Sequence, residues 1–267
     1  MTIEEAKVHV ENRPCALEVE KAFDFDKEYA AFREDLLNWQ RDFSDAVYMP
    51  AQFGAGAVAS WYSQYGFENY FLLAGLHPDL MIKLFKIGGA MGRCKSRLVA
   101  AAVREGLYPK AVLLGEDICT QRGPMISEVF LAEHYAPELA YGLEPLLEAG
   151  CKPVWHCDGD VRLLLPMLFE CGVKGLQGFQ PECGMKIEDI VKLRTKQNEK
   201  LLIFGPMAVT TELPVFTPIQ IRERVRHIAN VCKDEADLVF FTSNTICPDV
   251  PLENLLAMHD EIRNIFY

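Results

Sequence analysis

The feature that most constrains the fold is a regular alternation of short apolar runs with longer amphipathic stretches. Six runs are short and apolar enough to be buried β-strands, namely residues 46–50, 111–115, 153–156, 175–179, 201–205 and 238–242. Strands that alternate with helices in this way are typical of a parallel sheet with helical crossovers. The chain is therefore expected to be an α/β protein.

Local signals mark the ends of the helices between these runs. Pro78 stands where a first helical residue is expected, since its fixed φ suits that position. Gly150 and Gly172 stand where helices end. Residues 217–220 form a capping box that contains a proline, and a last helix is predicted from residue 251 to about residue 263.

The N-terminal part of the chain differs in pattern from the rest. Residues 26–41 predict one amphipathic helix whose apolar side chains share a face, namely Tyr29, Phe32, Leu36 and Trp39. We therefore expect an N-terminal helical segment over residues 1–41, followed by one α/β domain over residues 42–267.

A closed barrel is favoured over an open doubly wound sheet. The length of 267 residues is ordinary for a (β/α)8 TIM-type barrel, which typically needs ~250. Neither GxGxxG nor GxxxxGK[ST] follows any predicted strand, so the usual nucleotide-binding signatures of an open sheet are missing. Since eight strands are needed, either two lie in residues 1–42 and 54–69, or the barrel is shortened at its N-terminal end.

Charge, hydropathy and cysteine content argue against several classes of protein, namely nucleic-acid-binding, membrane-spanning and disulfide-rich secreted proteins. The net charge of −11 argues against nucleic acid or anionic lipid, which both bind basic surfaces. No apolar run approaches the ~18 residues that span a membrane, and the acidic N-terminus lacks the apolar core of a signal peptide. Nine cysteines without CxxC spacing do not resemble a disulfide framework. We therefore expect a cytoplasmic protein that acts on a small molecule.

The segment 152–165 carries the strongest chemical signal. Its strand ends in His156, Cys157 and Asp158, and Gly159 then turns the chain toward a helix. Side chains alternate along a strand, so His156 and Asp158 point the same way, at the strand end where barrels keep catalytic groups. An imidazole and a carboxylate on one face suit proton transfer or metal binding. Alternatively, His156 is a satisfied core residue and Asp158 only caps the next helix.

A second polar cluster follows the strand at residues 111–115. Glu116 and Asp117 stand at its end, and either carboxylate is expected to join His156 as acid, base or metal ligand. Arg122 lies a few residues later and is a candidate for pairing with a substrate carboxylate. The alternative is that one carboxylate caps a helix and that Arg122 is a solvated loop charge.

Further candidates follow the remaining strands. After the last strand, Asn244 is expected to bind substrate or coordinate weakly, and Cys247 is a candidate soft metal ligand unless its thiol is buried and inert. Other side chains near strand ends are expected to line the substrate pocket, namely Gln177, Phe179, Gln180, Glu182 and Met207.

Several motifs together resemble the uroporphyrinogen decarboxylase superfamily. The run that begins at His156 (HCDGDVRLLLP) is similar to that family's strand ending in His-x-(Cys/Asp)-Gly, and residues 169–177 and 180–186 are similar to the strand and loop that follow. Other pieces arrive in the family's order, namely residues 65–68 with 77–80, residues 123–127 and residues 248–258. The resemblance covers residues 44–267 and implies a (β/α)8 barrel.

One branch of the family removes acetate carboxyls from a tetrapyrrole without a cofactor. Its members carry an N-terminal Arg-Gln-Ala-Gly-Arg loop, which this sequence lacks. Residues 43–47 resemble that branch's F-S-D-I-L strand, which implies a substrate-binding role for Asp45. A second register, in which residues 42–53 match the family's next strand, remains open.

The other branch comprises zinc-dependent methyltransferases that exchange methyl groups with corrinoid proteins. Their zinc is held by His-x-Cys and a later cysteine. Here His156 matches, Asp158 stands at the first cysteine position and Asn244 stands near the second. Zinc accepts oxygen and nitrogen ligands, but the loss of thiolates argues against a coenzyme M transferase. The resemblance implies a harder site of His156 and Asp158, with Glu116 or Asp117 nearby.

The resemblance thus implies zinc-dependent methyl transfer with a corrinoid protein as partner, in an enzyme similar to an O-demethylase. One alternative is a cofactorless decarboxylase of a tetrapyrrole or another carboxylate, in which His156 positions the substrate and Arg122 pairs with its carboxylate. Another is a shortened, non-catalytic binding homologue. A gap in the barrel also predicts a homodimer.

Overall fold

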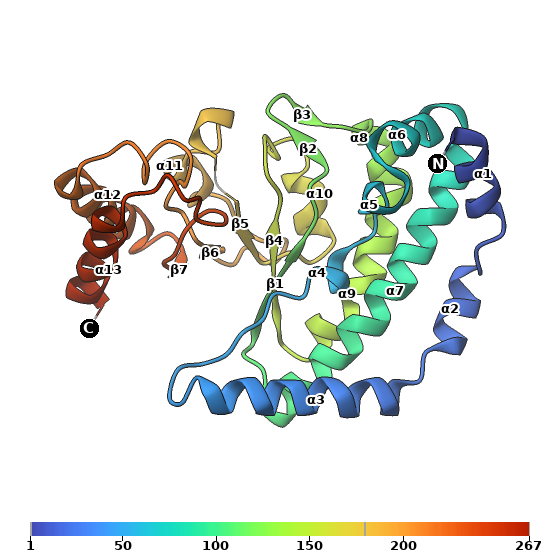
Figure 1. The fold of residues 1–267 in the computed structure, drawn as a ribbon, viewed down its shortest axis with the longest axis horizontal. Helices are drawn as coiled ribbons and strands as arrows, with labels where there is room; N and C mark the ends of the chain where they lie inside the picture. The colour runs from blue at the N-terminus through green and yellow to red at the C-terminus, as the bar shows by residue number, and fades with distance from the viewer. Residues whose placement is uncertain (1, 179, 267) are drawn as a thin grey trace.

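The computed structural model describes residues 2–178 and 180–266 (Figure 1). Among these residues, the main sheet has five parallel strands in the order β1-β4-β5-β6-β7. Their bounds are β1 Ala111–Gly115, β4 Lys152–His156, β5 Gly175–Gln177, β6 Leu202–Phe204 and β7 Asp237–Val239. Each strand pairs with the next strand of this sheet along the chain, as in one sector of a barrel, whereas the order reverses within a doubly wound sheet.

Helices surround this sheet, and a small antiparallel hairpin stands apart from it. The hairpin consists of β2 Cys119–Thr120 and β3 Gly123–Pro124. Before β1 come α1 Ile3–Glu11, α2 Ala16–Ala22, α3 Phe25–Asp42, α4 Phe53–Gly56, α5 Tyr62–Tyr65, α6 Phe67–Leu76 and α7 Pro78–Glu105. After the hairpin come α8 Glu128–Phe130, η1 Leu131–Tyr135, α9 Ala136–Glu148, α10 Leu165–Glu170, η2 Pro181–Cys183, α11 Ile187–Ile190, α12 Pro218–Cys232 and α13 Leu252–Phe266.

The long helix α7 organises the N-terminal half. It lies beside α9, and α4 packs between it and the start of the sheet (Figure 1). Glycines allow this close approach: a Cβ atom at Gly88 would lie 2.6 Å from the Val58 carbonyl oxygen, and one at Gly92 would lie 3.1 Å from that of Ala55. Residues 53–62 are thereby held between α7 and the sheet.

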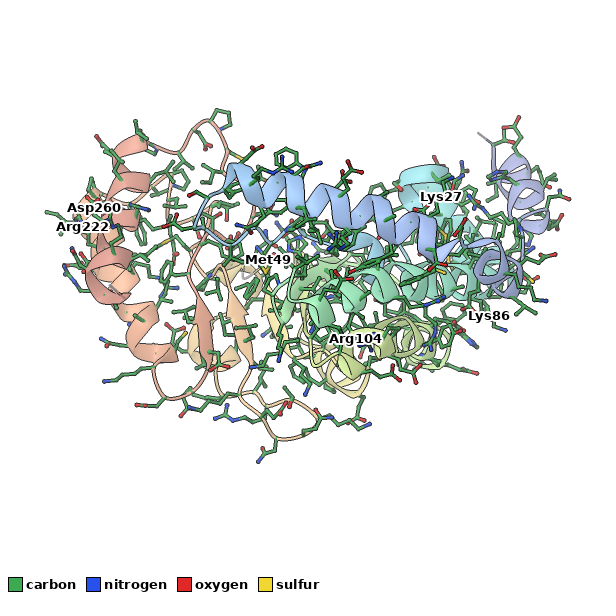
Figure 2. All side chains as sticks on the ribbon, turned by 90° about the horizontal axis from the view of Figure 1, so that it is seen from below. Lys27, Met49, Lys86, Arg104, Arg222 and Asp260 are labelled. Carbon is green, nitrogen blue, oxygen red and sulfur yellow. The ribbon has the colours of Figure 1, made fainter. Side chains whose placement is uncertain are left out.

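The N-terminal helices pack on α7 from its other sides. Helix α3 matches the predicted amphipathic helix over residues 26–41 within one residue at each end, and its Leu36 is buried. Figure 2 shows α3 crossing the molecule beside α7, while Arg222 on α12 and Asp260 on α13 pair at the opposite end, 3.2 Å apart.

Five of the six predicted strands are present, and the helix ends agree with the signals in the sequence. Gly150 and Gly172 have φ angles of +70° and +101°, and Thr217 forms the predicted capping box before α12. Pro78 is the first residue of α7.

The first predicted strand, residues 46–50, is not a strand. The Gln40 side chain takes the backbone groups that pairing would use: it donates to the Ala46 carbonyl over 2.6 Å and accepts from the Tyr48 N–H over 2.9 Å. Pro50 has no N–H to offer, and the next backbone hydrogen bond to β1 comes only after this segment, from the Gln52 N–H to the Leu113 carbonyl (2.7 Å). This segment therefore runs alongside the sheet without joining it.

The two strands that a complete barrel would need in residues 1–42 and 54–69 are absent from the described residues, because these segments form helices α1–α3 and α4–α6. Of the two alternatives, the complete eight-stranded barrel is therefore wrong for the described residues, whose main sheet has five strands. None of the described helices combines the length and the apolar character needed to cross a bilayer.

Candidate metal site at the strand ends

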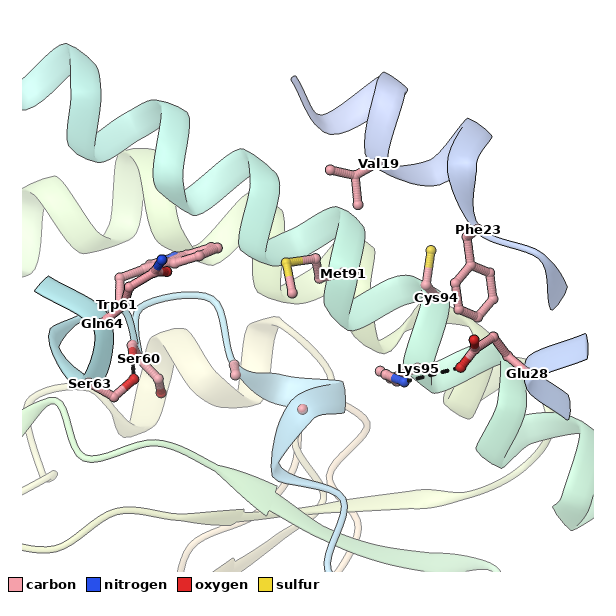
Figure 3. A pocket seen from close by; sticks show the side chains of 12 residues that line it. Val19, Phe23, Glu28, Ser60, Trp61, Ser63, Gln64, Met91, Cys94 and Lys95 are labelled. Atoms are coloured by element: carbon pink, nitrogen blue, oxygen red, sulfur yellow. Dashed lines mark hydrogen bonds and ion pairs between the residues drawn. The ribbon is translucent and has the colours of Figure 1, made fainter. Parts of the chain in front are cut away.

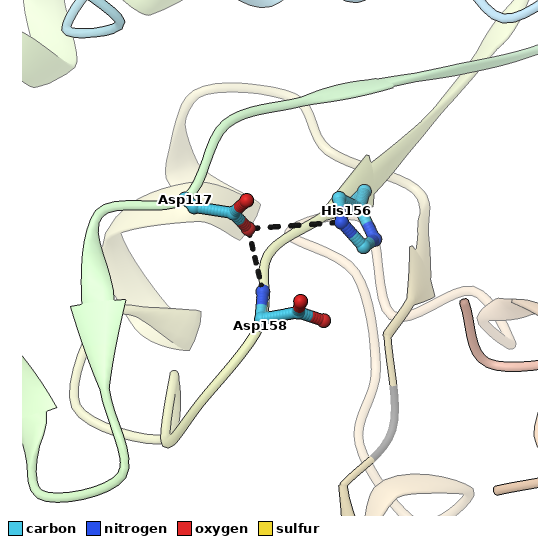
Figure 4. Close-up of side chains that lie close together, drawn as sticks. All are labelled: Asp117, His156 and Asp158. Carbon is cyan, nitrogen blue, oxygen red and sulfur yellow. Dashed lines mark hydrogen bonds and ion pairs between the residues drawn. The ribbon is translucent and has the colours of Figure 1, made fainter. Parts of the chain in front are cut away.

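Three metal-ligating side chains meet where β1 and β4 end, namely Asp117, His156 and Asp158 (Figure 4). Gly115 pairs with His156 in the sheet, so the residues that follow the two strands leave the same edge side by side. One ligand atom from each side chain lies within 4.8 Å of the other two. This brings together the predicted pair His156 and Asp158 and selects Asp117 from the two carboxylates after β1.

The distances between the candidate ligand atoms suit a bound cation. The Asp117 Oδ1 atom lies 3.6 Å from His156 Nε2 and accepts a hydrogen bond from the Asp158 N–H over 2.9 Å. Ligand atoms held tetrahedrally around one zinc ion at about 2.1 Å lie roughly 3.4 Å apart. Asp117 is exposed while His156 and Asp158 are half-buried, so the site is open on one side.

The Gln177 side chain determines which nitrogen of His156 faces the site. Its Nε2 donates to the Ser243 carbonyl over 2.5 Å and to the Thr242 carbonyl over 3.4 Å. Its Oε1 therefore faces His156 Nδ1, with which it forms a hydrogen bond. Since this oxygen only accepts, Nδ1 carries a hydrogen, and Nε2 is the nitrogen that faces Asp117. This is the orientation expected of a metal-ligating histidine.

Asn244 contacts the site through Asp158. Its Nδ2 donates to both carboxylate oxygens of Asp158, over 3.0 and 2.8 Å, while its Oδ1 accepts from the Thr245 N–H over 2.6 Å. The amide therefore presents donors rather than its oxygen, and a ligand role for Asn244 is not supported. Burial raises the pKa of Asp158; His156 opposes this shift, and the negative charge of Asp117 adds to it.

The structure corrects the predicted metal role of Glu116. Its carboxylate is buried away from the three donors and accepts from the backbone N–H groups of Val58 (3.2 Å) and Ala59 (2.7 Å) and from the Ser60 hydroxyl (2.7 Å). Burial raises the pKa of Glu116 to about 7. Successive residues point to opposite sides of an extended chain, so Asp117 faces the site while Glu116 anchors residues 58–60.

The remaining predicted residues do not join the three donors. Arg122 is exposed in the turn of the β2–β3 hairpin. Cys247 is exposed, with its sulfur 3.9 Å from the Thr245 carbonyl oxygen, which corrects its predicted role as a ligand. Asp45 lies in an exposed turn after α3.

The expected pocket residues after β5 and β6 have structural partners. Gln180 accepts from the Gly159 N–H over 2.5 Å and so holds the turn after Asp158. Glu182 is exposed and accepts from the Thr210 hydroxyl over 2.7 Å. Met207 is fully buried, and Phe179 lies outside the described residues.

Two aromatic residues near the site were not anticipated. The Phe53 ring meets the His156 ring edge-on, with centroids 5.9 Å apart. The Tyr62 phenol is half-buried near Asp117, and its pKa is raised chiefly by burial and secondly by the charge of Asp117. Neither residue follows a strand, so the strand-end rule could not find them; the tertiary packing of residues 53–62 brings them to the site.

Comparison with known proteins finds a solved structure of similar fold but no matching sequence. Neither a protein-family model nor a curated protein sequence matches the chain. Among solved structures, the chain is similar to a methyltransferase from Methanosarcina mazei, with a TM-score of 0.57 and 13% sequence identity over 76% of this chain and 54% of that one. The fold is methyltransferase-like. The chain spans about half the length of this methyltransferase.

Proposed function

We propose that this chain is a metal-dependent methyltransferase-like enzyme of the uroporphyrinogen decarboxylase superfamily, with its metal held by Asp117, His156 and Asp158. The observation that carries the proposal is the convergence of one imidazole and two carboxylates at the carboxyl ends of adjacent parallel strands. This edge is where barrel and α/β enzymes place their chemistry. The methyltransferase-like fold and the ordered motifs in the sequence support the same family.

The donor set fits zinc, which accepts histidine nitrogen and carboxylate oxygen. Three protein ligands leave a fourth position for substrate, as catalytic rather than structural zinc sites do. A bound ion would supply Lewis-acid polarisation of a substrate oxygen or sulfur.

The surrounding residues prepare this site. Gln177 keeps Nε2 of His156 available, and the hydrogen bonds from Asn244 hold the Asp158 carboxylate in one orientation. The open side at Asp117 leaves room for a substrate, and the Phe53 ring covers one edge of the imidazole. We propose methyl transfer from a methoxylated small molecule, with a corrinoid carried by a partner protein as acceptor; this finer assignment is supported by the family resemblance.

The decarboxylase alternative has less support. It needs a cation for the substrate carboxylate, and Arg122, the residue expected to supply it, is exposed in the hairpin turn. A non-catalytic homologue is distinguished by experiment.

The test is the metal content of protein purified without added metal. We expect about one equivalent of zinc per chain in the native protein, and less than a tenth of that in His156→Ala, because the nitrogen ligand is lost. The matched control is His227→Ala. His227 also pairs with a carboxylate (Glu188, 2.7 Å) but lies exposed on α12 outside the cluster, so this variant keeps its metal.

The other outcomes separate the alternatives. Metal-free protein that turns over a porphyrinogen or another carboxylate supports the decarboxylase and contradicts the proposal. Absence of both metal and turnover supports a binding homologue.

A further inference from the structure

A cavity of 460 Å³ lies between the N-terminal helices, α7 and the segment that carries Gly54, Ser60 and Trp61 (Figure 3), and none of the metal-site residues lines it. Its walls are largely apolar. Val19 on α2 and Phe23 just after it line one wall, Met91 and Cys94 on α7 line a second, and Trp61 just before α5 lines a third. This volume lies within the ~300–1,000 Å³ typical of small-molecule sites.

Several polar groups on the walls already have partners inside the protein. The Ser60 hydroxyl donates to Glu116 over 2.7 Å, and the Ser63 hydroxyl donates to the Ser60 carbonyl over 2.9 Å. The Trp61 Nε1–H donates to the Val58 carbonyl over 3.0 Å, and the side-chain oxygen Oε1 of Gln64 accepts from the Arg13 guanidinium. A strongly polar ligand would lose its hydration without gaining partners here. The walls therefore favour an apolar ligand body.

One end of the cavity offers a donor and an acceptor together. Lys95 Nζ and Glu28 Oε2 lie 3.9 Å apart, with side chains 51% and 44% exposed. This ion pair is loose enough for a hydrogen-bonding group to insert between the charges. Its two charges are opposite, so this end of the cavity favours neither an anionic nor a cationic head group.

We propose that this cavity binds a small neutral amphipathic molecule: a flat apolar body lying against Trp61 and Met91, with one head group that both donates and accepts a hydrogen bond, such as a phenol, between Lys95 and Glu28. Flat rings suit an indole and a thioether, which both contact aromatic faces favourably. This site is separate from the metal site and does not depend on the proposed metal chemistry.

Ligand binding is nonetheless connected to the metal site by the chain itself. Residues 53–62 present Gly54, Ser60 and Trp61 to the cavity, while Phe53 contacts His156. The same segment is anchored by Glu116, next to Asp117. A molecule in the cavity therefore rests on the segment that also forms one side of the metal site.

The experiment uses 2-naphthol as probe on the full chain. Calorimetry measures its affinity, and ¹³C-methyl labelling of methionine locates the site through the Met91 signal, assigned with Met91→Leu. We expect a saturable shift of the Met91 signal and one probe per chain. Gly54→Leu should weaken binding at least about tenfold, a loss of ~1.4 kcal/mol, because the new side chain fills the cavity.

Gly54 is a favourable position for a filling variant. A Cβ atom there would meet only Lys95 Cγ, at 3.7 Å, so the backbone is not strained. The matched control is Gly75→Leu on α6, where a Cβ atom meets nothing within 4 Å; this variant should bind as the native protein does. Met91→Lys is a second variant that should weaken binding, because it places a charge on the apolar wall. Met91 is 45% exposed, so the lysine can reach water and the protein should stay folded.

Two results would overturn the proposal. One is a Met91 signal that does not saturate, or binding in Gly54→Leu and Met91→Lys equal to that of the native protein. The other is tighter binding of 2-naphthoate or of 2-naphthylmethylammonium than of 2-naphthol, since the cavity would then select a charged head.

Discussion

At the scale of single residues, the site depends on side-chain amides whose orientation is fixed by backbone carbonyl and N–H groups. Gln177 is 7% exposed and joins His156 on β4 to the chain that follows β7. Asn244, one residue beyond Ser243, holds Asp158. These two amides orient the candidate ligands His156 and Asp158 and are not part of the candidate donor set.

Gln177→Leu should change both the tautomer of His156 and its affinity for metal. Without the acceptor at Nδ1, the metal-free imidazole should populate both tautomers, whereas the native protein holds its hydrogen on Nδ1. Metal affinity should fall by about 10–100-fold, as is usual when such a supporting hydrogen bond is removed. Nitrogen NMR of the imidazole measures the first effect and competition with a chelator the second.

The conservative variant Gln177→Glu retains an acceptor and should restore the Nδ1–H tautomer. An unchanged tautomer in Gln177→Leu would refute the positioning role even if the protein binds metal. The tautomer is measured without metal, so this outcome is independent of the proposed function.

At the scale of elements, the glycines of α7 decide how the site is assembled. Helix α7 is long and amphipathic, but its Gly88, Gly89 and Gly92 let α4 and α9 approach its backbone. Residues 53–62 can then reach both His156 and Glu116. Larger side chains on this face of α7 would push that segment away from the sheet.

Gly88→Ala should therefore destabilise the protein although alanine is the better helix former. Its Cβ atom would lie 2.6 Å from the Val58 carbonyl oxygen and 2.8 Å from its Cα atom. Overpacking of this kind costs about 1–3 kcal/mol. Gly75→Ala in α6, where the added atom meets nothing, should instead gain ~0.5–1 kcal/mol. Urea denaturation measures both, and equal free energies of unfolding would contradict the packing argument.

At the scale of the whole molecule, the described residues form one parallel sheet of five strands with its helices, and the chain spans about half the length of a methyltransferase of similar fold. The candidate ligands come from segments after two strands, so a bound ion would link the chain at Asp117 to the chain at His156 and Asp158. Metal binding should then contribute to global stability, because a preformed site does not exist in the unfolded chain.

Removal of metal should lower the free energy of unfolding. With free zinc at a hundred times its dissociation constant, the stabilisation should be about 2.7 kcal/mol, and excess chelator should abolish it. His156→Ala should show no difference between zinc and chelator, and His227→Ala should respond as the native protein does. A native protein whose urea midpoint is unaffected by zinc would contradict the site.

The sequence alone determined the class of the fold and much of its detail. Short apolar runs and an amphipathic pattern are local signals, and they correctly predicted five strands and helix α3. Proline at the start of α7 and the capping box of α12 likewise marked helix starts. Strand alternation and the strand-end rule likewise placed His156 and Asp158 on one face.

Tertiary structure decided the rest, because these choices depend on contacts between distant residues. Residues 46–50 are apolar, yet the Gln40 side chain occupies the backbone groups that a strand would pair. Glu116 and Asp117 are equivalent in the sequence, and the backbone N–H groups of residues 58 and 59 select Glu116 for burial and leave Asp117 to the site. Phe53 and Tyr62 reach the strand ends because glycines of α7 admit the segment that carries them, a packing relation that no local pattern encodes.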